Sequence, residues 1–116
     1  MQIVVPLIIN HKPSFTEALD CCNGDMNKAI YWYKVAKRVH QRTMIAESQN
    51  WKCCWCGKTM TEQPNKRNSV TREHIIPKSQ GGGEDRSNIA AACNRCNSKR
   101  GIMPVEEFMS KYLKAA

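Results

Sequence analysis

Two Cys-x-x-Cys pairs constrain the fold of this chain more than any other feature of its sequence. Cys53 and Cys56 form the first pair, and Cys93 and Cys96 form the second. Each spacing places two thiolates on one side of a tight turn, so two pairs in one small chain predict a tetrahedral zinc site. Since the protein fills all four ligand positions, we expect this zinc to be structural rather than catalytic.

The other three cysteines fit this site poorly. Cys54 could compete with Cys53, but pairing it with Cys56 gives the wrong spacing. Cys21 and Cys22 have no partner pair, and we expect both to be small buried apolar residues. A redox function for either Cys-x-x-Cys pair is disfavoured, because nothing in the sequence suggests a thioredoxin-like βαβ unit.

The chain is short and strongly basic. Its 116 residues are enough for one domain, or for a domain with a small appendage. With 18 Lys and Arg residues against 10 Asp and Glu residues, the formal net charge is +8. A zinc held by four thiolates adds 2 − 4 = −2, which leaves about +6. This charge favours a polyanionic partner, nucleic acid before an acidic membrane surface.

The apolar run Ile3–Ile9 does not predict a membrane segment. It has seven residues and is interrupted by Pro6, whereas a helix needs about 20 residues to span a bilayer. It also lacks the basic start and the small-residue cleavage site of a signal peptide. We therefore expect no membrane partner and a reducing, cytoplasmic location, which is the host-cell cytoplasm if the chain is phage-encoded.

Residues 1–50 are predicted to form an extended arm and a basic helical hairpin. Residues 1–13 are interpreted as a short strand or an arm. Ser14 and Glu17 have the spacing of a capping box, which starts one helix, and Asp25 can cap a second, longer helix. The apolar stripe of the second helix consists of Ala29, Ile30, Tyr33, Ala36 and Val39.

The turn between these helices has two interpretations. The segment CCNGDMNKAIYWY (Cys21 to Tyr33) has a helix–turn–helix appearance and also resembles the ubiquitin-associated type of helical hairpin. The basic face of the second helix could contact DNA. A hairpin that packs on the rest of the chain explains the same pattern, and we favour this simpler interpretation.

Residues 51–116 are predicted to form an α+β domain. One strand is expected over 69–76, a partner strand over 88–92 and a short helix over 93–100. Pro104 suits the first turn of a last helix. The apolar face of that helix would consist of Val105, Phe108, Met109, Tyr112 and Leu113.

The 36 residues from Gly57 to Ala92 exceed what a small zinc ribbon needs between its cysteine pairs. His74, Asn88 and Asn97 follow one another at steps of 14 and 9, and Glu73 immediately precedes His74. Taken singly, each of these residues has an ordinary explanation as a surface, turn or helix residue. Their combination favours a functional site over four unrelated residues.

The full pattern E-H-I-x-P-x-S-x-G-G…N-I…C-x-x-C-N-x-K resembles the HNH endonuclease family. It covers about 48 residues, Cys53 to Arg100, and includes every position of the family signature. The resemblance implies a ββα-metal fold, which many members hold together with a four-cysteine zinc. Residues 1–50 and the last helix lie outside it.

The resemblance implies a role for each residue of the pattern. His74 would be the general base, which suits a side chain whose ordinary pKa is near neutral pH. Glu73 and Asn97 would bind one catalytic metal. Asn88 would hold the loop so that a backbone carbonyl accepts the other ring N–H of His74. Since neighbouring strand residues point to opposite faces, a bulge or distortion is expected to bring Glu73 and His74 into one cleft.

The expected catalytic metal is Mg²⁺ or Mn²⁺, because carboxylate and amide oxygens are hard ligands. Many family members have His where Asn97 stands, and Asp or His is common where Glu73 stands. Lys78, Lys99 and Arg100 flank the proposed cleft and are candidate phosphate contacts, although a solvated surface charge explains each equally well. The substrate would be DNA, with double-stranded DNA favoured and little base specificity expected.

Three functions are compared. A metal-dependent DNA endonuclease is the leading interpretation. A non-catalytic zinc module that binds nucleic acid would not need the intact Glu-His-Asn-Asn set, and a protein-interaction module would leave the basic charge unexplained. The small size fits a nuclease of a phage or mobile element, and it leaves open a homodimer or a larger phage or host protein partner.

Overall fold

The computed structural model describes residues 3–112 and divides into two compact units. The first unit is Met1–Met44 and the second is Ile45–Ala116. The division falls inside a helix, whereas the sequence places the domain boundary after residue 50. The first two residues of the predicted arm and the end of the last helix, including Leu113, lie outside the described residues.

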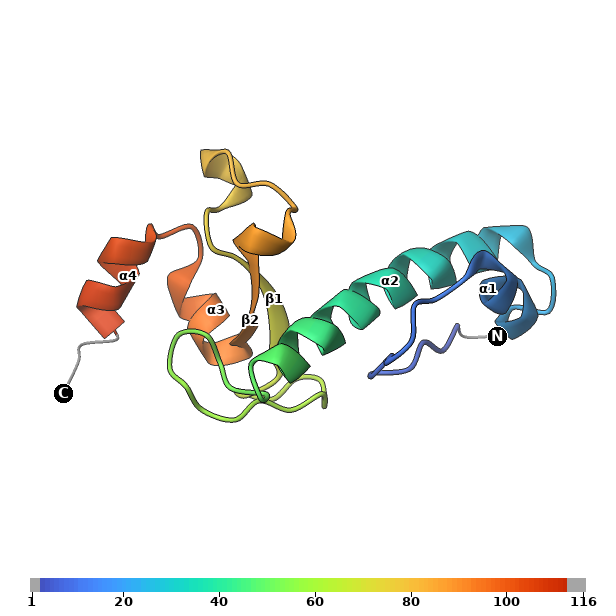
Figure 1. Cartoon of the computed structure of the whole chain (residues 1–116), viewed down its shortest axis with the longest axis horizontal. Coiled ribbons are helices and arrows are strands. Elements are labelled where there is room, and N and C mark those ends of the chain that lie inside the picture. The colour runs from blue at the N-terminus through green and yellow to red at the C-terminus, as the bar shows by residue number, and fades with distance from the viewer. Residues whose placement is uncertain (1–2, 113–116) are drawn as a thin grey trace. The chain divides into compact units, whose positions relative to one another are not determined.

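The first unit contains the predicted pair of helices, α1 (Phe15–Cys21) and most of α2 (Met26–Ser48) (Figure 1). Oγ of Ser14 accepts a hydrogen bond of 3.1 Å from the backbone N–H of Glu17, which confirms the predicted start of α1. Oδ1 of Asp25 accepts one of 3.1 Å from a backbone N–H in the first turn of α2. Both helices therefore begin where the capping residues place them.

The arm before α1 is irregular and contains no strand over residues 3–13. Its backbone bonds to side chains of α2 within the same unit. Nε1 of Trp32 donates to O of Val4 at 3.2 Å, and Nδ1 of His40 lies 2.9 Å from O of Ile9. These contacts satisfy carbonyls that a strand would have paired with a neighbouring strand.

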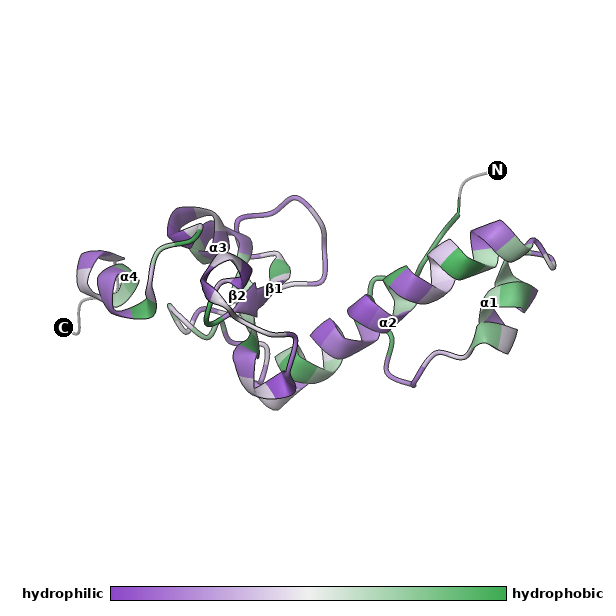
Figure 2. Cartoon of the chain, turned by 90° about the horizontal axis from the view of Figure 1, so that it is seen from above, coloured by the Kyte–Doolittle hydropathy of each residue, from purple (hydrophilic) through white to green (hydrophobic). Residues whose placement is uncertain are grey.

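The buried stripe of α2 differs from the predicted one at two positions. Ala29, Ala36 and Val39 are buried as expected, but Ile30 is 42% exposed and Trp32 is only 3% exposed. The arm contacts Trp32 and so moves the buried face toward it. Figure 2 shows that hydrophobic and hydrophilic residues alternate along α2. Neither α2 nor any other helix among residues 3–112 has the length and apolar character needed to cross a membrane.

The two cysteines at the end of α1 lie in different environments. Cys22 is the C-cap of α1 and is buried, as expected. Cys21 is exposed, contrary to expectation. Consecutive helical residues point about 100° apart, so one can face the core while its neighbour faces solvent.

The second unit is built on a β-hairpin followed directly by a helix. β1 (Val70–His74) and β2 (Ile89–Cys93) pair in an antiparallel, continuous register. α3 (Asn94–Arg100) follows β2 and lies beside the hairpin, and α4 (Val105–Tyr112) comes after it (Figure 1). This is the predicted α+β class, a ββα-metal fold.

The connection between the strands is compact. It contains two short 3₁₀ helices, η1 (Lys78–Gln80) and η2 (Arg86–Asn88). A Cβ at Gly82 would lie 1.6 Å from O of Ile76, so only glycine allows this close approach. The glycines after β1 therefore serve to fold the loop back on the end of the strand.

The core of the second unit includes the strands, the end of α2 and one residue of α4. Phe108 is fully buried, and its ring centroid lies 5.4 Å from that of Trp55. Met109 and Tyr112 are 49% and 47% exposed, so the described part of α4 buries Phe108 rather than the whole expected apolar face. Other buried apolar residues of this core include Ile45, Met60, Val70, Ile89 and Ala92.

Candidate metal centre and active site

The four cysteines of the two Cys-x-x-Cys pairs form one cluster, and all their sulfur atoms lie within 4.8 Å of one another. Sγ of Cys56 is 3.9 Å from Sγ of Cys93. A tetrahedral zinc with Zn–S distances of about 2.3 Å holds its sulfurs about 3.8 Å apart. The cluster therefore fits a structural metal such as zinc. Cys54 is exposed and lies outside the cluster, as its spacing predicts.

The hydrogen bonds around the sulfurs also favour a bound cation. Sγ of Cys53 accepts backbone N–H bonds from Cys93 at 3.2 Å and from Trp55 at 3.4 Å. A hydrogen bond from Cys54, together with these backbone groups, lowers the pKa of Cys53 to about 4. Burial raises the pKa of Cys96. Four sulfurs this close cannot all be ionised unless a cation joins them.

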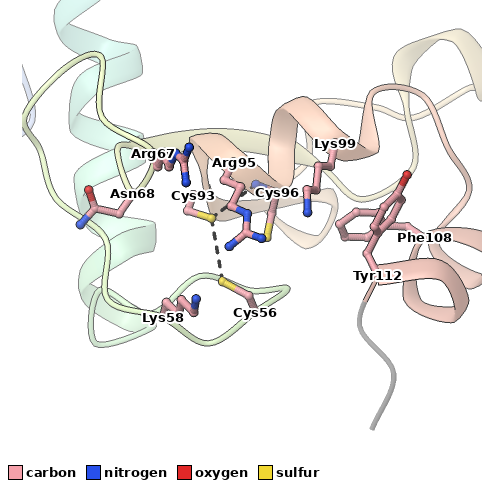
Figure 3. Close-up of a pocket in the computed structure, with 10 residues that line it drawn as sticks. All are labelled: Cys56, Lys58, Arg67, Asn68, Cys93, Arg95, Cys96, Lys99, Phe108 and Tyr112. Carbon is pink, nitrogen blue, oxygen red and sulfur yellow. Dashed lines mark hydrogen bonds between the residues drawn. The ribbon is translucent and has the colours of Figure 1, made fainter.

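A basic pocket of about 450 Å³ lies beside the thiols (Figure 3). Cys56, Cys93 and Cys96 reach it from two separate segments of the second unit. A zinc with four thiolates carries a net charge of −2, and cationic side chains nearby can offset it. The four that line the pocket are Lys58, Arg67, Arg95 and Lys99.

One face of β1 lies against α3. Nδ2 of Asn97 donates to Oγ1 of Thr71 at 2.9 Å. Nη1 of Arg100 lies 3.5 Å from Oε1 of Glu73. Because Thr71 and Glu73 are two residues apart in a strand, they share this face. Glu73 and Asn97, the two expected ligands of a catalytic metal, are thus on the same side of the hairpin.

The opposite face of β1 carries Arg72 and His74. Nη2 of Arg72 lies 3.0 Å from Oε2 of Glu84, and Nε2 of His74 lies 2.9 Å from Oε1 of the same carboxylate. The register of β1 is continuous through His74, without the bulge that we expected. Glu73 and His74 therefore point to opposite faces, as regular strand geometry requires.

Glu73 is buried, with 5% of its surface exposed. Nε1 of Trp55 donates to Oε2 of Glu73 at 3.1 Å, and Arg100 lies on its other oxygen. Burial raises the pKa of Glu73, while Trp55 and Arg100 act in the opposite direction. These two partners supply the positive charge and the hydrogen bond that a buried carboxylate needs.

Asn88 ties the two ends of the loop together. Its Oδ1 accepts from N–H of Ile76 at 2.8 Å, and its Nδ2 donates to O of Ile76 at 3.1 Å and to O of Gly83 at 2.9 Å. Its backbone O accepts from N–H of Ile75 at 2.9 Å. Asn88 therefore holds the residues that directly follow His74. Within the described residues, the hydrogen bond of the imidazole is to Glu84 rather than to the expected backbone carbonyl.

The structure places Arg72 and Glu84 beside His74, although the sequence did not single them out. Arg72 stands two positions before His74, so strand alternation alone places both on one face. Glu84 offers no such signal, because its contact with residues ten to twelve positions earlier depends on the path of the loop.

The three candidate phosphate contacts have different environments. Lys78 is exposed, and its Nζ lies 2.9 Å from Oε1 of Glu84. Lys99 is exposed, and its Nζ lies 5.3 Å from the ring centroid of Tyr112. Arg100 differs from the surface position that we expected, because it is 2% exposed and its guanidinium donates to backbone carbonyls. Burial removes Arg100 from the surface that a phosphate could reach.

Comparison with known proteins agrees with this architecture. Over 64 residues, the chain is 33% identical to the CRISPR-associated endonuclease Cas9 of Corynebacterium diphtheriae. That match covers 54% of this chain but only 5% of the relative, so the chain corresponds to a small part of it.

A family model described as HNH endonuclease matches residues 53–113, which is 61 of the 116 residues. The matched segment contains both cysteine pairs, the β-hairpin and the helix that follows it. The chain belongs to the HNH endonuclease family.

Proposed function

We propose that this chain is a metal-dependent endonuclease that hydrolyses phosphodiester bonds of DNA. The observation that carries the proposal is an HNH-family ββα unit that contains Glu73, His74, Asn88 and Asn97. Each of these residue types has a use in phosphodiester hydrolysis, and their joint presence favours catalysis over binding alone.

His74 is the proposed general base. It is the last residue of β1, and 19% of its side chain is exposed, so water can approach the ring. A neutral imidazole can take a proton from that water as the oxygen attacks phosphorus. Asn88 is a positioning residue in this scheme, because it holds the backbone that follows His74.

Glu73 and Asn97 are the proposed ligands of the catalytic metal. They lie on the α3 face of β1, and their carboxylate and amide oxygens suit a hard cation such as Mg²⁺ or Mn²⁺. Nδ2 of Asn97 donates to Thr71, which leaves its Oδ1 available as a ligand atom. Such a metal, when bound, supplies Lewis-acid stabilisation of charge on the phosphate and the departing 3′ oxygen.

The edge of β1 that faces away from β2 is bonded near both ends. N–H of Val70 donates to O of Thr61 at 2.8 Å, and Nη1 of Arg100 donates to O of His74 at 2.8 Å. Within the described residues, the sheet has two strands and β1 pairs with β2 along one side. Because Glu73 is buried against Trp55 and Arg100, one phosphodiester reaches both His74 and Glu73 only if these contacts rearrange. A single-metal mechanism at this regular strand therefore needs that rearrangement when DNA and metal bind.

One observation favours the alternative of a non-catalytic zinc module that binds nucleic acid. Glu73 is bonded to Trp55 and Arg100, and His74 is bonded to Glu84. A binding module would keep these internal contacts throughout. A nuclease must exchange at least some of them for metal, water or substrate.

Cleavage of supercoiled plasmid separates the two functions. We expect zinc-loaded protein to cut with Mg²⁺ or Mn²⁺ and not without an added divalent metal. His74→Ala should reduce the rate by at least about 100-fold, since general-base catalysis contributes about that much. His11→Ala is the matched control, because His11 is an exposed histidine of the first unit.

Cutting that survives His74→Ala would remove His74 as the base. DNA binding without cutting under any metal would favour the binding module. The ratio of nicked to linear product shows whether one or both strands are cut, since a single cleft nicks unless it acts twice or the chain pairs with a second copy.

The proposed substrate is double-stranded DNA, which the net charge of +8 also favours. We also propose a homodimer or a larger protein partner, of a phage or of its host, since a single cleft cuts one strand at a time. Seven free cysteines, four of them clustered as metal ligands, support a reducing cytoplasmic location.

A further inference from the structure

Two cationic side chains and the imidazole of His74 converge on the carboxylate of Glu84. Oε2 of Glu84 lies 3.0 Å from Nη2 of Arg72. Oε1 lies 2.9 Å from both Nε2 of His74 and Nζ of Lys78. One carboxylate thus takes charged or polar donors from three positions of the hairpin and its loop. This is also how proteins surround a phosphate.

The donor side chains are held in place by more of the surrounding structure than the carboxylate of Glu84 is. Arg72 and His74 lie two residues apart on one face of β1, and their side chains are only 22% and 19% exposed. Lys78 begins η1, directly after buried Pro77. Glu84 is 53% exposed and follows three glycines. Removing Glu84 from the site needs movement of one exposed side chain, whereas the strand keeps two of the donors in place.

The guanidinium of Arg72 also has a hydrogen-bond donor that Glu84 does not use. Its Nε is buried and has no hydrogen-bond partner within residues 3–112. A carboxylate has two oxygens, and Glu84 already shares them among three side chains. A phosphodiester has the same charge of −1 and can also accept from an arginine fork.

We propose that Arg72, His74 and Lys78 form a binding site for a backbone phosphate of DNA, and that Glu84 occupies it until DNA displaces the carboxylate. This inference rests on the proposed function, since it places a phosphate beside the proposed base. Exposed ion pairs are individually weak, so a polyanion can replace Glu84 without a large penalty. Glu84 then acts as an internal competitor that lowers the affinity of the free protein for DNA.

The proposal is tested by binding rather than by cleavage. Fluorescence anisotropy measures the Kd of the full-length, zinc-loaded protein for a short DNA duplex, at fixed ionic strength and without added Mg²⁺ or Mn²⁺. Glu84→Gln should bind about fivefold more tightly than wild type, a size typical of a surface ion-pair network. Asp85→Asn is the matched control, because it removes the same charge one residue away and its side chain makes no capping hydrogen bond. The control should change Kd less than about twofold.

The gain must also depend on the donors. Adding Lys78→Gln to Glu84→Gln, or Arg72→Gln in a second variant, should abolish most of the gain. Inorganic phosphate should shift the NMR signals of the His74 ring at a lower concentration in Glu84→Gln than in wild type. Because Lys78 is an exposed residue, its variant remains informative even if the Arg72 variant folds poorly.

Equal tightening by Glu84→Gln and Asp85→Asn would overturn the proposal, since net charge alone would explain it. So would a gain that persists after Lys78 is replaced. The outcome does not depend on the nuclease activity. If the protein cuts DNA but Glu84→Gln binds DNA no more tightly than wild type, the phosphate site is wrong and the proposed nuclease function stands. If the protein does not cut DNA but Glu84→Gln shows the predicted gain in DNA affinity, the phosphate site stands and the nuclease function is wrong.

Discussion

Arg100 lies against Glu73 inside the second unit, with 3.5 Å between Nη1 and Oε1 and with both side chains at least 93% shielded from solvent. Arg100 also donates to O of His74 at 2.8 Å, to O of Met103 at 2.9 Å and to O of Ile75. One guanidinium therefore joins α3 to the end of β1 and compensates a buried carboxylate.

Replacing Arg100 should destabilise the protein strongly. Arg100→Met leaves Glu73 buried without its cation, and breaking a buried pair in this way costs about 3–5 kcal/mol. Urea denaturation of the zinc-loaded protein at neutral pH measures the loss in free energy of unfolding. Lys99→Met is the control, because Lys99 is exposed and its loss should cost less than about 1 kcal/mol. Equal costs for the two variants would show that the buried contact does not stabilise the fold.

Removing zinc should unfold the second unit. Structural zinc contributes about 10–16 kcal/mol of apparent binding free energy in small domains. A zinc held by this cluster would join the first cysteine pair to the end of β2 and α3. Elemental analysis should find one zinc per chain, and a strong chelator should abolish the dispersed NMR signals of the hairpin. Cys96→Ser should have the same effect, whereas Cys54→Ser should not, because Cys54 lies outside the cluster. A hairpin that stays folded without metal would contradict the structural role.

Features that depend on spacing and local chemistry were predicted from the sequence. The Cys-x-x-Cys pairs determine which sulfurs can share a metal, and the capping residues Ser14 and Asp25 determine where two helices begin. Alternation along a strand predicts that Glu73 and His74 face opposite sides, although the proposed mechanism needs both at one phosphate. The strand is regular in the structure, so the two side chains do face opposite sides.

Features that depend on the path of the chain could not be predicted in this way. Trp32 is buried and Ile30 is exposed because the arm covers one side of α2. Arg100 looked like a surface cation beside Lys99, but its helix position directs it into the hairpin. The contact of Glu84 with His74 needs the loop conformation, which no local pattern encodes.

The carboxylate of Glu84 should stabilise the protein at neutral pH and lose this effect in acid. Lys78 first, then His74 and Arg72, lower the pKa of Glu84 from 4.5 to about 2. Because the folded-state pKa is the lower one, the contribution is complete above about pH 4.5 and disappears as the pH falls toward 2. Urea denaturation of wild type and Glu84→Gln should give a difference in the free energy of unfolding that shrinks as the pH falls below about 4.5. The comparison covers the pH range in which both zinc-loaded proteins keep their metal and stay folded. A difference that grew as the pH fell below about 4.5 would contradict the ion-pair network.

Two adjacent glycines should respond in opposite ways to alanine. A Cβ at Gly82 would lie 1.6 Å from O of Ile76, whereas the nearest atom to a Cβ at Gly83 is Oδ2 of Asp85 at 3.8 Å. Gly82→Ala must push the loop away from the end of β1, at a cost of about 1–3 kcal/mol. Gly83→Ala should be neutral or should stabilise the fold by up to about 1 kcal/mol, because alanine restricts the unfolded chain. Thermal or urea denaturation measures both, and equal effects would mean that the loop does not approach Ile76 this closely.

Asn88 should affect cleavage more than its contribution to stability explains. Asn88→Ala removes the side-chain bonds to Ile76 and Gly83, which hold the backbone between His74 and Glu84. Losing such a supporting contact costs about 10–100-fold in activity, and we expect a fall of that size in the plasmid-cleavage rate with Mg²⁺. Asn68→Ala is the matched control, because its amide makes a single long bond of 3.4 Å to O of Thr59. Asn88→Asp keeps the acceptor for N–H of Ile76 and loses both donors, so it should fall between wild type and Asn88→Ala. If Asn88→Ala cuts as fast as Asn68→Ala while the urea midpoint falls, Asn88 supports only the fold and does not position the base.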